Sequence, residues 1–200
     1  MKLYYSPGTC SLSPHIVLCE AGIAHEAVKV DLKTKKTESG DDFLAINPRG
    51  YVPSLQLDDG SVLAEGPAIV QYLADLAPAA RLAPPAGSFA RVRLQEWLNF
   101  ISTELHKGFS PLFQGAPDAW QAVVRKGLAS RFDDLAETLA RQPYLMGDEF
   151  SVADAYLFTV LGWARWVKID LAPWPALEQY IARIAARPGV QKALAREGLI

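Results

Sequence analysis

The dipeptide Val52-Pro53 constrains this chain most, because it opens an apolar run with a residue that has no backbone N–H. Such a residue is a poor start for a central strand. A cis bond before Pro53 would turn the chain sharply and leave the N–H and C=O of Val52 pointing outward. Those groups could pair with a short antiparallel peptide, as a one-residue strand addition. The alternative is a trans proline in an ordinary loop, which is far commoner for an isolated X-Pro bond.

Charge and composition exclude several classes of partner. The 200 residues allow one large domain or two modest ones, and 50% of them are hydrophobic. The 20 basic and 22 acidic residues leave a net charge of −2, so no basic surface indicates nucleic-acid binding. The apolar stretch from Val152 to Trp163 is interrupted by Asp154 and is too short to span a membrane. We therefore expect a protein without nucleic-acid or membrane partners.

The cysteines and the N-terminal residues indicate the cellular compartment in which the protein acts. Cys10 and Cys19 are spaced neither as a metal knuckle nor as a C-x-x-C pair. The residues from Met1 onward lack the apolar core of a signal peptide. We therefore expect a cytoplasmic protein with neither a disulfide nor a bound metal.

Residues 1–80 have the pattern of an α/β domain. The order is strand, helix, strand, then Pro53, then two strands and a helix, which predicts a mixed four-stranded sheet with helices packed on it. Proline suits the first turn of a helix, and glycine suits its end or a tight turn. These signals place the predicted elements at Lys2–Tyr5, Ser13–Ala21, Ala27–Leu32, Ser54–Leu57, Ser61–Leu63 and from Gly66 onward.

The second part, residues 88–200, is predicted to be an all-α domain. Pro78–Ser88 has the composition of a linker. Beyond it, leucine, isoleucine and phenylalanine recur at helical spacing. Ser151 and Asp154 match a capping box at the start of an apolar helix, so Asp154 is predicted to be structural.

Cys10 is the leading candidate for chemistry. It lies just before a predicted helix, where free N–H groups and the positive end of the dipole favour a thiolate. Its C-x-x-S spacing to Ser13 is that of a redox site with one thiol. The alternative is a small buried hydrophobic residue.

Other polar residues could bind a small charged ligand. Glu65 precedes a helix start and could bind an ammonium group while helix N–H groups bind a carboxylate, or it could simply interact with the dipole. Asn99, Thr103 and His106 are spaced to form a polar line on one helix, with Lys107 alongside, unless this is only a solvated face. A lysine of the 33–36 loop could reach a ligand carboxylate.

Taken together, these residues resemble the glutathione S-transferases, and within them the bacterial beta class. The resemblance covers essentially the whole chain and implies a thioredoxin-like N-terminal domain and an all-helical C-terminal domain. The motifs that carry it are Tyr4-Tyr5-Ser6-Pro7-Gly8 with Cys10, Val52-Pro53, Glu65-Gly66, Asn99 to Lys107, and Ser151-Val152-Ala153-Asp154.

The resemblance also implies roles for particular residues. Cys10 would lie against the glutathione sulfur, Val52, before a cis Pro53, would pair with the cysteinyl backbone, and Glu65 with Gly66 would hold the γ-glutamyl end. The remaining implied glutathione contacts are Lys35 and His106 at the glycyl end and thiol region, and Asn99, Thr103, Glu104 and Lys107, partly from the second subunit of a homodimer.

Three functions follow as hypotheses. The first is conjugation of glutathione, as co-substrate, to small hydrophobic electrophiles in detoxification, with Cys10, Ser11 or His106 activating the thiol. The second is glutaredoxin-like thiol–disulfide exchange through Cys10. In this exchange, Cys10 attacks a glutathionylated substrate and free glutathione resolves the product. The third is a non-catalytic carrier of hydrophobic ligands.

Overall fold

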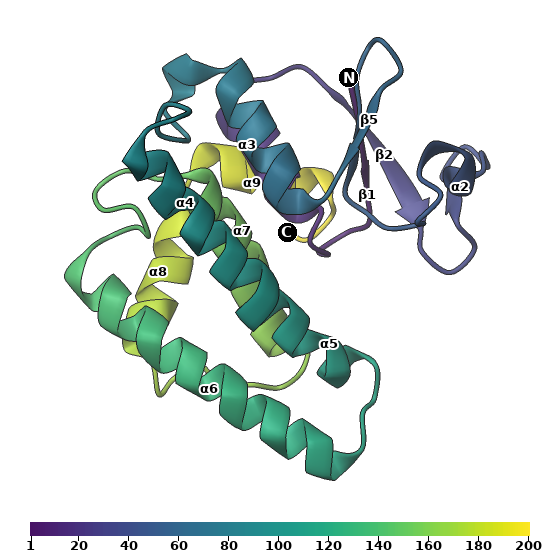
Figure 1. Cartoon of the computed structure of the whole chain (residues 1–200). Coiled ribbons are helices and arrows are strands. Elements are labelled where there is room, and N and C mark those ends of the chain that lie inside the picture. Colours follow the sequence, from purple (N-terminus) through teal and green to yellow (C-terminus); the bar gives the residue numbers. More distant parts are fainter. The chain divides into compact units, whose positions relative to one another are not determined.

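The computed structural model describes all residues, 1–200, and divides into two compact units (Figure 1). The first unit comprises Met1–Ala83 and Arg187–Ile200, and the second comprises Pro84–Ala186. The prediction placed the whole of residues 88–200 in the helical domain. The structure instead groups the C-terminal segment with the N-terminal unit.

This regrouping has a packing cause. Helix α9 (Pro188–Arg196) lies against α1 (Leu12–Glu20). Arg187 and Glu20 form an ion pair at 2.6 Å between Nη2 and Oε2. Gly189 permits the close approach, because a Cβ there would lie 2.6 Å from Oε1 of Glu20. Nothing local in the sequence identifies this partner.

The first unit is built on a five-stranded mixed sheet with the order β3-β2-β1-β4-β5. The central strand β1 pairs in parallel with β2 and antiparallel with β4, and β5 closes the hairpin with β4. The strands are β1 Lys2–Tyr5, β2 Glu26–Asp31, β3 Lys36–Thr37, β4 Ser54–Gln56 and β5 Val62–Ala64.

The prediction of four strands is wrong by one, because it treated β3 as part of a polar loop. Strand β3 has only two residues and pairs antiparallel with Val30 and Asp31 at the sheet edge. A strand this short shows no alternation of apolar and polar residues, so its pairing partner rather than its own sequence defines it.

Helices complete the first unit. α1 also packs against α3 (Gly66–Leu76), and its residues from Leu12 to Leu18 are all buried. The short helix α2 (Phe43–Ile46) supplies Phe43 to a cluster of buried side chains with Tyr4 and Val52. A 3₁₀ turn, η1 (Pro78–Ala80), lies near the end of the Met1–Ala83 part of this unit. The loop that carries Cys10 therefore joins a central strand to a buried helix.

The second unit is all-helical, as predicted (Figure 1). At its centre lies α7, in which every residue is buried. None of the helices in the chain is both long and apolar enough to cross a membrane. The helical segments are α4 Phe89–Phe100, the π-helix η2 Ile101–His106, α5 Lys107–Phe113, α6 Asp118–Arg141, α7 Val152–Leu161, the 3₁₀ turn η3 Gly162–Arg165 and α8 Pro175–Ala185.

The carboxylate of Asp154 organises the start of α7, which confirms its predicted structural role. It is fully buried and accepts hydrogen bonds from the N–H and the hydroxyl of Ser151, both at 2.8 Å. It also accepts from the N–H of Leu145 at 2.8 Å and from the Tyr180 hydroxyl on α8 at 2.9 Å. The carboxylate thus caps one helix and joins it to two other segments of the unit.

We predict that Asp154→Ala destabilises the protein by about 3–5 kcal/mol, more than the roughly 0.5–2 kcal/mol of a lost helix cap. The reason is that the variant leaves buried donors from Ser151, Leu145 and Tyr180 without an acceptor. Urea unfolding followed by tryptophan fluorescence measures the change. As a control, Ser151→Ala removes one hydroxyl donor and costs about 1 kcal/mol. A loss below that of Ser151→Ala would contradict this role.

Candidate active site

Cys10 lies in the loop between β1 and α1, beside the segment that contains Pro53. Its thiol donates to the carbonyl oxygen of Val52 at 3.3 Å, although the two residues are 42 positions apart in sequence. The bond between Val52 and Pro53 is cis, as predicted. The structure therefore brings together the two features that the sequence analysis singled out separately.

Ser11 does not face this segment, which argues against its predicted role as thiol activator. Its side chain is fully buried. Its hydroxyl accepts from the N–H of Ser6 at 3.1 Å, donates to the Ser6 carbonyl at 3.2 Å and lies 2.9 Å from the Thr9 hydroxyl. A hydroxyl without exposed surface cannot contact a substrate sulfur, so Ser11 shapes the loop instead.

A buried carboxylate from the C-terminal segment also holds this loop. Glu197 accepts from the N–H of Gly8 at 2.8 Å through one oxygen, and its other oxygen lies 2.9 Å from Nδ1 of His15. Gly8 has a φ of +70°, a conformation that favours glycine. The sequence analysis missed Glu197 and His15, since residues 182 positions apart give no local signal.

Glu65 and Gly66 lie at the N-terminus of α3, next to the cis-proline segment. A Cβ on Gly66 would lie 3.8 Å from Cγ of Pro53, which is ordinary contact. The Glu65 side chain is exposed, and Arg49, which the sequence analysis did not single out, lies 3.6 Å from it. Glu65 also has a φ of +69°, an uncommon and costly conformation for a side chain this size.

Lys35 contacts the residues that directly precede Val52. Its ammonium group donates to the carbonyl of Gly50 at 2.9 Å and lies 6.0 Å from the ring centre of Tyr51. Tyr51 directly precedes Val52 and is 70% exposed. Six predicted residues thus gather in the first unit: Cys10, Lys35, Val52, Pro53, Glu65 and Gly66.

The predicted polar line lies in the second unit, and its helix is not a regular α-helix. Asn99 lies in the last turn of α4, whereas Thr103 and Glu104 belong to the π-helix η2. Thr103 donates to the Asn99 carbonyl at 2.9 Å, and Glu104 pairs with Arg131 at 2.8 Å. Asn99, Thr103, Glu104 and Lys107 are all exposed. A π-helical segment frequently occurs at functional sites.

His106 departs from this exposed line. Its Nδ1 lies 2.7 Å from the hydroxyl of Tyr156, and its ring packs edge-on against Trp163 with ring centres 4.8 Å apart. Burial lowers the pKa of His106 to about 4, and the charge of Lys107 acts in the same direction. His106 is therefore neutral at pH 7. It cannot supply the positive charge that the sequence analysis considered, though it can still form hydrogen bonds.

A surface pocket opens beside these residues within the second unit. It has a volume of about 300 Å³ and lies between the segment from η2 to α5 and helix α6. Its lining combines apolar side chains with the polar residues of η2. The lining residues are Thr103, Glu104, Lys107, Gly108, Pro111, Trp120, Val124, Gly127, Leu128 and Arg131.

We predict that His106 stays neutral throughout the neutral pH range. Because its pKa falls from 6.5 to about 4 on folding, the unfolded chain takes up the proton first, and stability is lost as the pH falls through this window. The shift corresponds to about 3 kcal/mol of unfolding free energy lost at acidic pH, and His106→Gln should not show this loss. Proton NMR of the histidine rings between about pH 8 and pH 3 measures the pKa, with the variant assigning the signal. A midpoint above about pH 6 would contradict the prediction.

Comparison with known proteins identifies the family. The sequence pattern of the glutathione S-transferase N-terminal domain matches residues 8–76, and that of the glutathione S-transferase C-terminal domain matches residues 100–188. The chain is 48% identical over 200 residues to glutathione S-transferase GstA of Escherichia coli O157:H7, and the match covers 100% of both chains.

Solved structures agree with this assignment. A ternary complex of BphK, a bacterial glutathione S-transferase, is 60% identical, with a TM-score of 0.97 over 99% of this chain and 100% of that one. The beta-class glutathione S-transferase of Sphingomonas chungbukensis is 49% identical, with a TM-score of 0.97 over 100% of both. These relatives favour conjugation over disulfide exchange. The chain belongs to the glutathione S-transferase family, in the bacterial beta class, and is a glutathione-conjugating enzyme.

Proposed function

We propose that the enzyme binds glutathione along the first unit and transfers it to small hydrophobic electrophiles, with the Cys10 thiol next to the glutathione sulfur. The observation that carries this proposal is the 3.3 Å contact between the Cys10 sulfur and the Val52 carbonyl oxygen. It puts a thiol beside the backbone segment that suits pairing with a short extended peptide. Glutathione is such a peptide and acts here as co-substrate.

The γ-glutamyl end of glutathione carries an ammonium group and a carboxylate side by side. In the proposed complex, the exposed carboxylate of Glu65 binds the ammonium group. The N–H of Gly66 and the positive end of the α3 dipole bind the carboxylate. Arg49, 3.6 Å from Glu65, limits the repulsion between the two carboxylates. Pro53 lies so close to Gly66 that a Cβ there would touch it, and it determines the path of the bound peptide.

The γ-glutamyl end determines where the cysteinyl and glycyl parts of glutathione lie. Val52 pairs through its backbone with the cysteinyl residue, and the Cys10 thiol then turns from the Val52 carbonyl to the glutathione sulfur. Lys35, whose ammonium group donates to the Gly50 carbonyl, is placed to bind the glycyl carboxylate instead. A lysine gains more from a carboxylate than from a neutral carbonyl.

In the reaction, Cys10 acts as a protonated hydrogen-bond donor. Two adjacent thiolates would repel each other, whereas a thiol donor stabilises the glutathione thiolate. The N-terminus of α1 favours the same negative charge. The glutathione proton passes to solvent, its sulfur forms a bond to the electrophilic carbon, and the leaving group departs with the bonding electrons. No step in this chemistry draws on a metal ion.

The second unit supplies the surroundings of the electrophile and the contacts between subunits in this proposal. Asn99, Thr103, Glu104 and Lys107 are exposed, as residues that reach a partner's glutathione must be. His106 serves as a neutral hydrogen-bonding group. We infer a homodimer on this basis, acting in the cytoplasm, where glutathione and cysteines outside disulfides, such as Cys10 and Cys19, stay reduced.

We predict that Glu65→Gln raises the KM for glutathione about tenfold or more, because a charge-assisted hydrogen bond to the ammonium group is lost. The melting temperature should not change, since this side chain is 74% exposed. Steady-state kinetics with a chlorinated dinitrobenzene gives the KM. Glu96→Gln, in another exposed ion pair, is the matched control and should leave the KM unaltered. An unchanged KM in Glu65→Gln would exclude the proposed clamp.

We predict that Cys10→Ala retains conjugation to within about tenfold, since only one hydrogen bond to the thiolate is lost. Its pH–rate profile should shift toward higher pH, because the bound glutathione thiol ionises less readily. The same variant should lose any reduction of glutathionylated substrates. Cys19→Ser controls for loss of a thiol elsewhere. Equal loss of both activities in Cys10→Ala would show that Cys10 is not simply a donor.

A further inference from the structure

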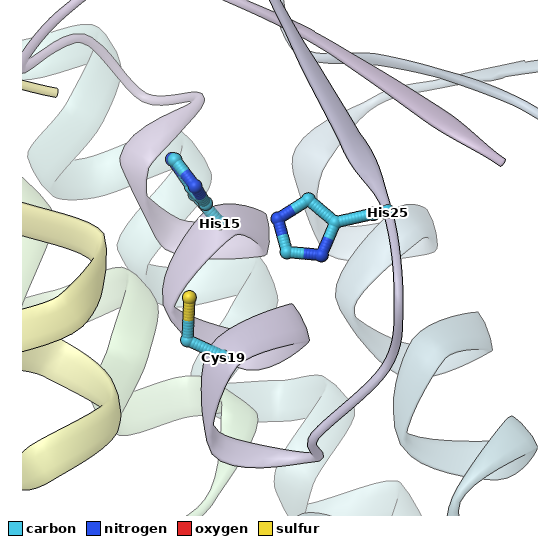
Figure 2. A group of neighbouring side chains, drawn as sticks. All are labelled: His15, Cys19 and His25. Carbon is cyan, nitrogen blue, oxygen red and sulfur yellow. The ribbon is translucent and has the colours of Figure 1, made fainter. Parts of the chain in front are cut away.

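Three side chains with metal-binding atoms meet in the first unit, away from the Cys10 segment. His15 and Cys19 lie one turn apart on α1, and His25 lies just before β2. Their ligand atoms all lie within 4.8 Å of one another. Figure 2 shows the Cys19 sulfur directed toward His15, and one nitrogen of the His25 ring directed toward both.

His15 has a buried nitrogen without a partner at this cluster. Its side chain has no exposed surface, and Nδ1 lies 2.9 Å from the Glu197 carboxylate. That contact assigns the proton to Nδ1 and leaves Nε2 as a free acceptor. Nε2 is buried and makes no hydrogen bond. Buried polar atoms are almost always paired, so this one needs an explanation.

The His25 ring, like that of His15, uses its Nδ1 to bond a neighbouring acceptor. Its Nδ1 lies 2.8 Å from the carbonyl of Ile23, which makes Nδ1 the protonated nitrogen. Its Nε2 then accepts from the guanidinium of Arg196 at 3.1 Å. Metal-binding histidines usually donate their other N–H to a carboxylate or a backbone carbonyl, as His15 and His25 do here.

We propose that His15, Cys19 and His25 form a Zn²⁺ site in which two imidazole nitrogens and one thiolate bind the ion and water occupies the fourth position. Thiolate and imidazole are ligands that zinc prefers, whereas Mg²⁺ and Ca²⁺ prefer oxygen. A tetrahedral site needs ligand atoms about 3.5 Å apart, so the cluster closes slightly on binding. Cys19 and His25 are only partly buried, which leaves room for this movement.

Arg196 competes with the ion for this position. Its Nη1 lies 3.1 Å from Nε2 of His25 and 4.0 Å from the Cys19 sulfur. The side chain is exposed at the end of α9, so it can move into solvent. The Cys19 thiol releases its proton to solvent when the sulfur–zinc bond forms, because the thiolate is the form that binds the metal. Binding should consequently tighten as the pH rises.

The experiment is a titration of the full-length, chelator-treated protein with Co²⁺, followed by displacement with Zn²⁺. We expect a sulfur-to-cobalt charge-transfer band that Zn²⁺ abolishes. Cys19→Ser should lose the band, His25→Gln should weaken binding at least about tenfold, and Arg196→Gln should shift the titration to lower metal concentration. Circular dichroism checks that each variant is folded.

Cys10→Ser is the matched control, because it removes the other thiol and should keep the band. A band that disappears in Cys10→Ser would place the metal at the glutathione segment and overturn the proposal. A band that persists in Cys19→Ser, or no band in the parent protein, would also overturn it. If Cys19→Ser fails to fold, the proposal fails unless Arg196→Gln tightens binding and His25→Gln weakens it.

Discussion

The buried carboxylate of Glu197 is the interaction on which the arrangement of the Cys10 loop depends. Burying an unpaired carboxylate is costly, and here its oxygens contact the N–H of Gly8 and the ring of His15. The first contact fixes the turn that precedes Cys10, and the second fixes α1 against the C-terminal segment. The same contact sets the tautomer of His15. One side chain thereby links the Cys10 loop to the His15, Cys19 and His25 cluster.

The second unit relies on a comparable device. Asp154 gathers donors from the start of α7, from the segment at Leu145 and from Tyr180 on α8. In both units a buried acid is acceptable only because several donors from separate segments converge on it. The residues that we propose to bind glutathione then lie on elements whose positions are fixed. Cys10 follows a central strand, and Glu65 begins a helix packed on α1.

Local patterns in the sequence predicted most of the elements. Gly66 and Pro67 correctly marked the start of α3, and Ser151 with Asp154 correctly marked α7, because caps and turns act over a few residues. Strand β3 was missed because pairing alone defines it. The polar line through Asn99 was drawn with α-helical spacing, whereas η2 is a π-helix, and His106 contacts Tyr156 instead of continuing the exposed line.

The sequence by itself predicted a thioredoxin-like part followed by a helical part, and the family, since these rest on short motifs and their order. It also singled out the six residues of the first unit that we propose to bind glutathione. Only the tertiary structure decided that α9 joins the first unit, that Ser11 is buried and that His106 is neutral. It also assembled His15, Cys19 and His25 into a set of metal-binding atoms, where the spacing of the cysteines had indicated none. Burial, pKa and convergent contacts depend on which distant segments pack together, and no local pattern records that.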